Sequence, residues 1–284
     1  MNVIDAQGLH KRYGDTHALA GFDLQVAPGR IVGLIGPNGS GKTTAIKTLL
    51  GLAQPDAGTL SVLGVNPQQQ RAELMARTAY IADTGILPGW MKVADLIDFV
   101  AGVHTGFDRP LAERTLASTD IRLNKKVKTL SKGMHVQLHL ALILAIHAEL
   151  LILDEPTLGL DILYRQRFYD ALLNDYMDGE RSIVVTTHEV REIEHILTDV
   201  VFIHHGRQIL SLDMDTIGEE FSKVLVQPDQ AESARALTPL SERPSLKGIE
   251  YIFRHAALKD LQHLGEISRP NLAELFVALL GDEA

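Results

Sequence analysis

The spacing of apolar residues changes along this chain, and each change predicts a different kind of element. Residues 1–30 alternate polar and apolar positions around turn residues such as Pro28-Gly29, which indicates short antiparallel strands. Later runs are apolar at most positions, as in parallel strands buried on both faces. We predict such strands in IVGLIG (31–36), TAYIAD (78–83), LLILD (150–154) and SIVVTTH (182–188).

The rest of the pattern predicts helices, a hairpin and a second domain. Residues 91–150 have mainly helical periodicity, and VVFIHHGRQIL (200–210) is typical of a hairpin. Short strand-like and helix-like pieces alternate after Met214. We therefore predict an α/β domain at residues 1–215, which includes a helical subdomain at about 84–148. A small α+β domain follows it at residues 216–284.

Composition then excludes several classes of protein. The chain has no cysteine, which rules out disulfides and thiolate metal sites. Its net charge of -9 and the lack of a long Lys/Arg run argue against a nucleic-acid partner. The N-terminal segment lacks the apolar core of a signal peptide, and the most apolar stretch (138–154) is interrupted by His139, His147 and Glu149. We therefore expect no membrane-spanning helix.

One glycine-rich segment carries specific chemistry. GPNGSGKT matches G-x-x-x-x-G-K-[ST] in full, between a predicted strand and a predicted helix. Backbone N–H groups of such a loop converge on phosphate oxygens, Lys42 would reach the β- and γ-phosphates, and the Thr43 hydroxyl would bind Mg²⁺. The segment predicts a P-loop NTPase core whose nucleotide site includes Gly36, Pro37, Asn38, Gly39, Ser40, Gly41, Lys42, Thr43 and Thr44. A GTPase would need N-K-x-D, and the NKKV at 124–127 does not provide it.

Two adjacent acids and a histidine end the predicted central strands. Asp154 and Glu155 close LLILD, at the sheet edge where ligands of α/β folds bind. Asp154 would hold Mg²⁺, and Glu155 would polarise a water for in-line attack on the γ-phosphate. His188 closes SIVVTTH and would hydrogen-bond a phosphate oxygen and that water. A structural histidine at a strand end is the alternative.

These motifs form a recognisable series. The phosphate loop, LSKGM (130–134), LLILDEP (150–156), TLGLD (157–161) and TTH (186–188) follow one another in that order. Over about residues 3–212 the series resembles the nucleotide-binding subunit of an ABC transporter. The resemblance implies an ATPase that uses ATP and Mg²⁺ and drives a separate membrane permease. It also implies an antiparallel N-terminal β-subdomain and a helical subdomain that carries LSKGM.

In that family LSKGM is the signature motif, more often written LSGGQ. The resemblance implies that two such subunits pack head to tail, so that the signature of one serves the ATP bound by the other. We expect a homodimer, with a different second ATPase subunit as the alternative. Ser131 would donate a hydroxyl to that ATP, and Gly133 would let the backbone approach it. Lys132 replaces the usual glycine, and either adds charge there or points to solvent.

Other roles follow from the same resemblance. Tyr13 matches the aromatic residue that stacks on adenine, with a core strand residue as the alternative. Asp161 matches the loop that meets the partner subunit. Asp83 stands where the family has a glutamine that binds Mg²⁺ and senses the permease; a carboxylate also ligates Mg²⁺ but donates no amide hydrogen bond. Trp90 and Met91 follow it, in the region that forms the permease groove in this family, unless they are core residues.

The branch of the family is suggested by the end of the chain. RPNLAELFVALLG (269–281) resembles the closing helix of ABC-2-type exporter ATPases, some of which also carry LSKGM. We therefore expect an ABC-2-type transmembrane permease as partner, and a cytoplasmic subunit that is peripheral on the inner face of the cell membrane. A soluble ABC ATPase that acts on a macromolecular complex is the rival hypothesis.

Overall fold

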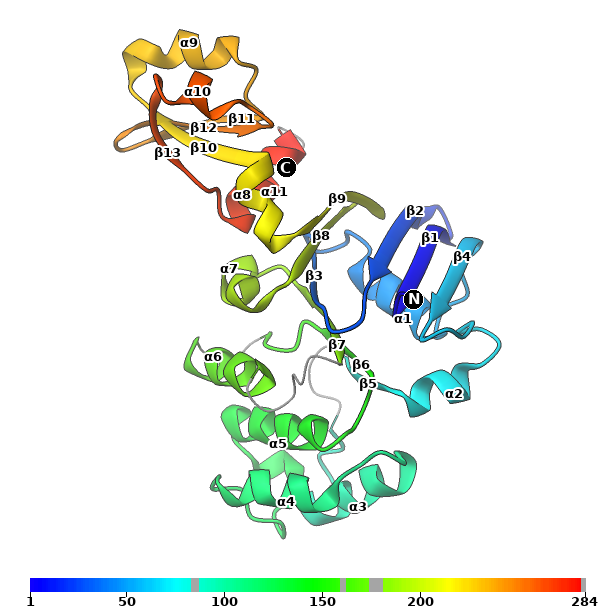
Figure 1. Cartoon of the computed structure of the whole chain (residues 1–284). Coiled ribbons are helices and arrows are strands. Elements are labelled where there is room, and N and C mark those ends of the chain that lie inside the picture. Colours follow the sequence, from blue (N-terminus) through cyan, green and yellow to red (C-terminus); the bar gives the residue numbers. More distant parts are fainter. Residues whose placement is uncertain (83–86, 159–161, 174–180, 282–284) are drawn as a thin grey trace.

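A central sheet of six strands organises the molecule. The computed structural model describes residues 1–82, 87–158, 162–173 and 181–281. Its central sheet has the order β5-β6-β7-β3-β8-β9, and only β8 and β9 pair antiparallel (Figure 1). The strands are β3 (Ile31–Ile35), β5 (Thr78–Ile81), β6 (Leu150–Asp154), β7 (Ser182–Thr187), β8 (Asp199–His204) and β9 (Arg207–Asp213).

Both faces of this sheet are buried, which is why its inner strands are continuously apolar. In β6, Leu151 and Leu153 face one core, whereas Leu150 and Ile152 face another. The first core lies under α5 (Lys132–Leu144), α6 (Ile162–Ala171), α7 (Val190–Ile193) and α11 (Leu272–Leu280). The second core lies under α1 (Lys42–Leu49) and the N-terminal sheet. Burying each such leucine contributes about 2 kcal/mol to stability.

The N-terminal sheet is antiparallel, as its alternating pattern predicts. Its order is β2-β1-β4, from β1 (Ile4–Tyr13), β2 (Thr16–Val26) and β4 (Ala57–Val62). Short helix α2 (Arg71–Ala76) follows β4 and leads into β5. One face of this sheet packs against α1, so the sheet borders the phosphate loop.

A helical subdomain has a small core of its own. It contains α3 (Val93–Val103), α4 (Arg109–Ala117) and α5. Residues such as Ile97, Leu116 and Leu138 form this core, while Ile143 and Leu144 of α5 join the core of the central sheet. Helix α5 therefore ties the subdomain to the sheet. No helix in the described part of the chain is long and apolar enough to cross a membrane.

The C-terminal unit has βαββαβ topology. Its strands have the order β11-β12-β10-β13 and pair antiparallel throughout, which is the split βαβ arrangement of ferredoxin-like folds. It comprises β10 (Phe221–Val226), α9 (Ala231–Ala236), β11 (Ser241–Ser245), β12 (Gly248–Arg254), α10 (Leu258–Leu261) and β13 (Gly265–Ser268), after the short α8 (Ile217–Glu220). Short 3₁₀ turns occupy Val127–Thr129, Glu194–Ile196, Met214–Thr216 and Pro228–Gln230.

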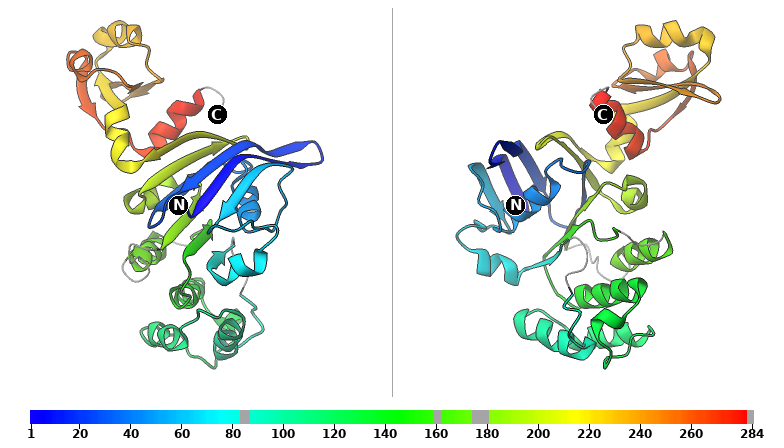
Figure 2. Two further views of the ribbon diagram at one scale, coloured as in Figure 1. Left: turned by 45° about the vertical axis from the view of Figure 1, so that its right-hand side comes forward. Right: turned by 180° about the vertical axis from the view of Figure 1, so that it is seen from behind.

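Helix α11 joins this unit to the central domain. Leu272 and Leu275 are buried in the core of the central sheet, and Phe276 packs edge-to-face on Phe202 at 5.0 Å. On the other side Glu274 accepts a 2.8 Å hydrogen bond from Lys223 of β10. The last helix of the predicted C-terminal domain thus also packs on the core of the central sheet. Both views in Figure 2 show the unit projecting from the end opposite α3 and α4.

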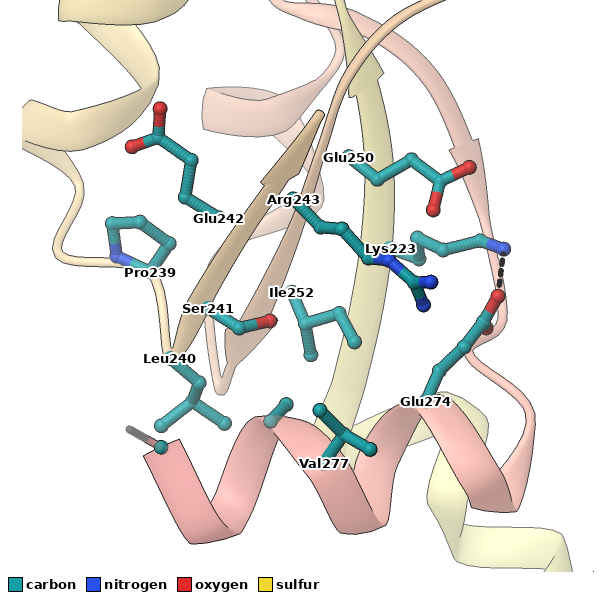
Figure 3. A pocket seen from close by; sticks show the side chains of 12 residues that line it. Lys223, Pro239, Leu240, Ser241, Glu242, Arg243, Glu250, Ile252, Glu274 and Val277 are labelled. Atoms are coloured by element: carbon teal, nitrogen blue, oxygen red, sulfur yellow. Dashed lines mark hydrogen bonds and ion pairs between the residues drawn. The ribbon is translucent and has the colours of Figure 1, made fainter. Parts of the chain in front are cut away.

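A pocket opens between α11 and the outer face of the C-terminal sheet. Its volume is about 470 Å³, and its lining mixes charged residues with apolar ones (Figure 3). The Lys223–Glu274 ion pair closes one end. No sequence motif predicts this pocket.

Candidate active site

The phosphate loop connects β3 to α1 and requires glycine at particular positions. Gly41, which caps α1, has φ of 111°, and a Cβ atom there would lie 2.5 Å from the carbonyl oxygen of Ala18. A Cβ atom on Gly36 would lie 2.3 Å from the carbonyl oxygen of Ile203. Both contacts are impossible for other residues, so the loop keeps its close approach to β2 and β8 only with glycine.

The polar groups of this loop point to an anion. No side chain caps the N-terminus of α1, which leaves its first N–H groups for a ligand. The Ser40 hydroxyl is buried and has no hydrogen-bond partner among the described residues. Lys42 is only 6% exposed, and its Nζ donates to the carbonyl oxygens of Gly36 at 2.7 Å and Pro37 at 3.2 Å. A bound phosphate would supply oxygen acceptors for the backbone N–H groups, the Ser40 hydroxyl and the Lys42 ammonium group.

Asp154 lies buried at the carboxyl end of β6. Its Oδ1 accepts a 2.6 Å hydrogen bond from the Thr186 hydroxyl of the neighbouring strand β7. The same Thr186 oxygen accepts the Glu155 N–H at 3.1 Å. Thr186 therefore fixes both acids. Since Asp154 and the Thr43 hydroxyl offer oxygen ligands, which Mg²⁺ prefers, the residues present fit that ion.

Glu155 has a strained backbone conformation, and its side chain lies between Lys42 and His188. Its φ is 47°, in the left-handed region that non-glycine residues rarely adopt. Its side chain is 12% exposed; Oε1 lies 3.3 Å from Lys42 Nζ and Oε2 lies 2.9 Å from His188 Nδ1. The order β6-β7-β3 brings the loops after these three strands together. Glu155 therefore links the phosphate loop to His188 across the sheet edge.

Lys42, Asp154, Glu155 and His188 lie at one edge of the central sheet, and we call this site the crevice. The signature residues lie apart from it, at the start of α5. Ser131 caps the helix by accepting the Met134 N–H at 3.2 Å, which leaves its own O–H proton free to donate. Gly133 is buried, whereas Lys132 is exposed. Asp83 and Asp161 lie outside the described residues. The structure thus gathers Lys42, the two acids and His188, but not the signature.

The exposure of individual side chains decides between alternatives that the sequence left open for Tyr13, Trp90 and Met91. The Tyr13 ring is half exposed at the end of β1 and carries Lys11 over it, so Tyr13 is not a core residue. Trp90 is exposed too, whereas Met91 packs in the helical core. Burial lowers the pKa of His139 to about 4, so that its imidazole is neutral at pH 7.

Thr186 is the site residue that sequence reasoning overlooked. The sequence did contain a signal for this residue, because Thr186 stands two residues before His188 at the end of a predicted buried strand. Only the parallel register of β6 and β7, which pairs Thr186 with Asp154, shows what the hydroxyl contacts.

The central sheet, the phosphate loop and the separate helical subdomain together define the class of P-loop ATPases. A family model described as "ABC transporter" matches residues 19–158. The Nod factor export ATP-binding protein I of Burkholderia thailandensis is 33% identical over 99% of this chain and 97% of its own length. The daunorubicin resistance ATP-binding protein DrrA3 of Streptomyces coeruleorubidus is 30% identical over 99% of this chain and 96% of its own length.

This chain belongs to the ABC transporter ATP-binding family. A solved structure of an ATP-binding subunit of an ABC transporter, 26% identical, aligns with a TM-score of 0.68 over 76% of this chain and 92% of that one. The protein is therefore an ATP-binding, ATP-hydrolysing subunit that works with a membrane permease, and the predicted family, fold and ATPase activity are confirmed. The rival hypothesis of a non-transport ATPase finds no support among these relatives.

Proposed function

We propose that this subunit powers an exporter through an ABC-2-type permease, as a homodimer on the inner face of the cell membrane. Its relatives are named for Nod factor export and daunorubicin resistance, which supports an exporter. The observation that carries the catalytic assignment is the position of Glu155 between Lys42 and His188.

In this proposal ATP binding rearranges the ion pair at the crevice. The β- and γ-phosphates compete with Glu155 and the loop carbonyls for Lys42, because a phosphate is the stronger acceptor. Glu155 then keeps His188 as its partner and turns its freed oxygen toward a water for in-line attack. His188 positions Glu155 and contacts the γ-phosphate.

Other residues complete the proposed site. Thr43 and Asp154 would hold Mg²⁺, and Asp83 stays a prediction from the sequence. The ion would neutralise charge on the β- and γ-phosphates when bound. The Tyr13 ring stacks on adenine, and Ser131 and Gly133 of a second copy close the site over the γ-phosphate. The rest of the phosphate loop, from Gly36 to Thr44, surrounds the phosphates.

A pull-down from native membranes tests the proposal. Tagged Glu155→Gln protein, given ATP and Mg²⁺, should recover a multi-span protein in fixed ratio, together with an untagged second copy of the subunit. Glu73→Gln, which alters an exposed glutamate on α2, is the matched control and should show less trapping. Recovery of ribosomes, or of only soluble partners, would contradict the transport assignment.

A further inference from the structure

The C-terminal pocket, between α11 and the outer face of the C-terminal sheet, has walls that other contacts hold in place. Its floor is the face of the sheet that α9 and α10 leave uncovered, since these two helices pack on the opposite face. Its wall is one face of α11, because Glu274, Val277 and Ala278 follow one another at helical spacing. Leu272 and Leu275 of the same helix are buried in the core of the central sheet. Contacts outside the pocket therefore fix its wall.

The register of the C-terminal sheet sets the chemistry of the pocket floor. Arg243 of β11 stands directly opposite Glu250 of β12. Ser241 and Ile252, two residues along each strand, form the next pair on the same face. Lys223 of β10 stands opposite Ile252 on its other side. The floor therefore offers both signs of charge beside an apolar side chain.

Arg243 and Glu250 do not neutralise each other. Opposite charges directly across an antiparallel pair stabilise a sheet when they meet. Arg243 is nevertheless exposed and Glu250 half-buried, and neither forms an ion pair or a side-chain hydrogen bond with any residue that the structure describes. Stability of the sheet therefore does not explain this pair of charges.

The other charged side chains of the lining already have partners. Lys223 and Glu274 form the 2.8 Å ion pair at one end of the pocket. Glu242 accepts hydrogen bonds from Arg235 at 2.8 Å and 2.5 Å. Within the described lining, one cation and one anion thus remain available to a ligand.

Apolar side chains line the rest of the pocket. Figure 3 shows Arg243 and Glu250 toward the Lys223–Glu274 pair, and Leu240 at the other end. Leu240 is 37% exposed and Val277 of α11 is 54% exposed, so an apolar group placed there would cover both side chains from water. The volume of about 470 Å³ lies in the range of pockets that bind small molecules.

We propose that the C-terminal pocket binds a small amphipathic zwitterion, whose carboxylate pairs with Arg243 and whose ammonium group pairs with Glu250. Its apolar body covers Leu240 and Val277. Arg243 and Glu250 are direct neighbours across the sheet, so the two charges of the ligand must also lie close together. An α-amino acid with a large apolar side chain meets this requirement, because it carries both charges on one carbon. The pocket lies at the end of the molecule opposite α3 and α4, away from the region around Trp90 that the family resemblance assigns to the permease.

A series of four compounds tests each part of this proposal. The full chain is titrated by calorimetry with L-phenylalanine, phenylpropionate, phenylethylamine and glycine up to about 10 mM, since ligands of this size bind in a roughly millimolar range. L-Phenylalanine should bind. The other three lack the ammonium group, the carboxylate and the apolar body in turn, and each should bind at least about tenfold more weakly. Excess ATP should not displace L-phenylalanine, because the phosphate loop is a different site.

Matched variants locate the ligand in the pocket. Arg243→Gln and Glu250→Gln should each weaken binding of L-phenylalanine about tenfold or more. Arg243→Gln should also abolish the preference for L-phenylalanine over phenylethylamine, because the carboxylate then has no partner. Lys259→Gln on α10 and Glu232→Gln on α9 remove the same charges from exposed residues on the opposite side of the sheet, and should bind like wild type. Circular dichroism and urea unfolding without ligand check that all four variants fold.

Three outcomes would overturn the proposal. One is equal binding of L-phenylalanine and phenylpropionate, which would leave Glu250 without a role. Another is equal loss of binding in all four variants, which would place the ligand elsewhere. The third is no binding of L-phenylalanine up to about 10 mM; a changed oligomeric state of Arg243→Gln in size-exclusion chromatography would then identify this face as a contact between protein chains. Each outcome leaves the ATPase assignment intact, because that rests on the crevice.

Discussion

Two partly buried lysine–glutamate pairs in this molecule have similar chemistry but lie in different structural settings. Lys42 and Glu155 lie 3.3 Å apart in the crevice, with side chains 6% and 12% exposed. Lys223 and Glu274 lie 2.8 Å apart beside the C-terminal pocket, with side chains 21% and 19% exposed. The first pair joins the start of α1 to the loop after β6, and the second joins a strand to a helix.

The backbone conformation of the glutamate distinguishes the two pairs. Glu155 has a positive φ, which costs about 1–3 kcal/mol and persists only where the surroundings enforce it. Glu274 is an unstrained helical residue, and it also completes the capping box of α11 with Asn271. Backbone strain therefore distinguishes the pair that we propose a ligand rearranges from the pair that holds two elements together.

The sharpest test of this difference is the same substitution in both pairs. Glu155→Gln should lower ATP turnover about 100-fold or more, because an amide does not accept the proton of an attacking water. ATP binding should persist, since Lys42 and the loop amides remain. Steady-state phosphate release and nucleotide binding measure the two effects. Normal turnover in this variant would remove Glu155 from its proposed role.

Much of the fold could be predicted from the sequence because its signals are local. The apolar runs of β3, β6 and β7, and the helical periodicity of α3 to α5, identify buried strands and packed helices. The crossing of α11 back to the central core was not predictable. Its apolar face suits either domain, and only the position of Phe202 and its neighbours decides which one it covers.

The site could be predicted as a set of residues but not as a geometry. The phosphate loop and the twin acids are motifs with fixed spacing. By contrast, the 2.6 Å bond from Thr186 to Asp154 depends on the register between β6 and β7.

A smaller effect is expected from Thr186→Val, which tests how far the crevice depends on buried hydrogen bonds. Asp154 would lose the hydroxyl that orients it, so half-maximal ATPase activity should need about tenfold more Mg²⁺. The free energy of unfolding should fall by about 1–3 kcal/mol. Thr187→Val is the matched control, because its hydroxyl accepts the Glu189 N–H and does not contact Asp154. Equal Mg²⁺ dependence in both variants would count against Asp154 as a magnesium ligand.

The smallest effect is expected from Glu274→Gln in the C-terminal pair. The amide oxygen can still accept the Asn271 N–H, so the variant loses mainly the charge that faces Lys223. A partly exposed ion pair contributes about 0.2–1 kcal/mol, and urea unfolding should show a loss in that range. Turnover should stay within about twofold of wild type, because no bond to the crevice is removed. A tenfold loss of turnover would instead show that α11 transmits changes at the C-terminal sheet to the crevice, with the Leu272 N–H bond to Glu194 beside α7 as the first contact to test.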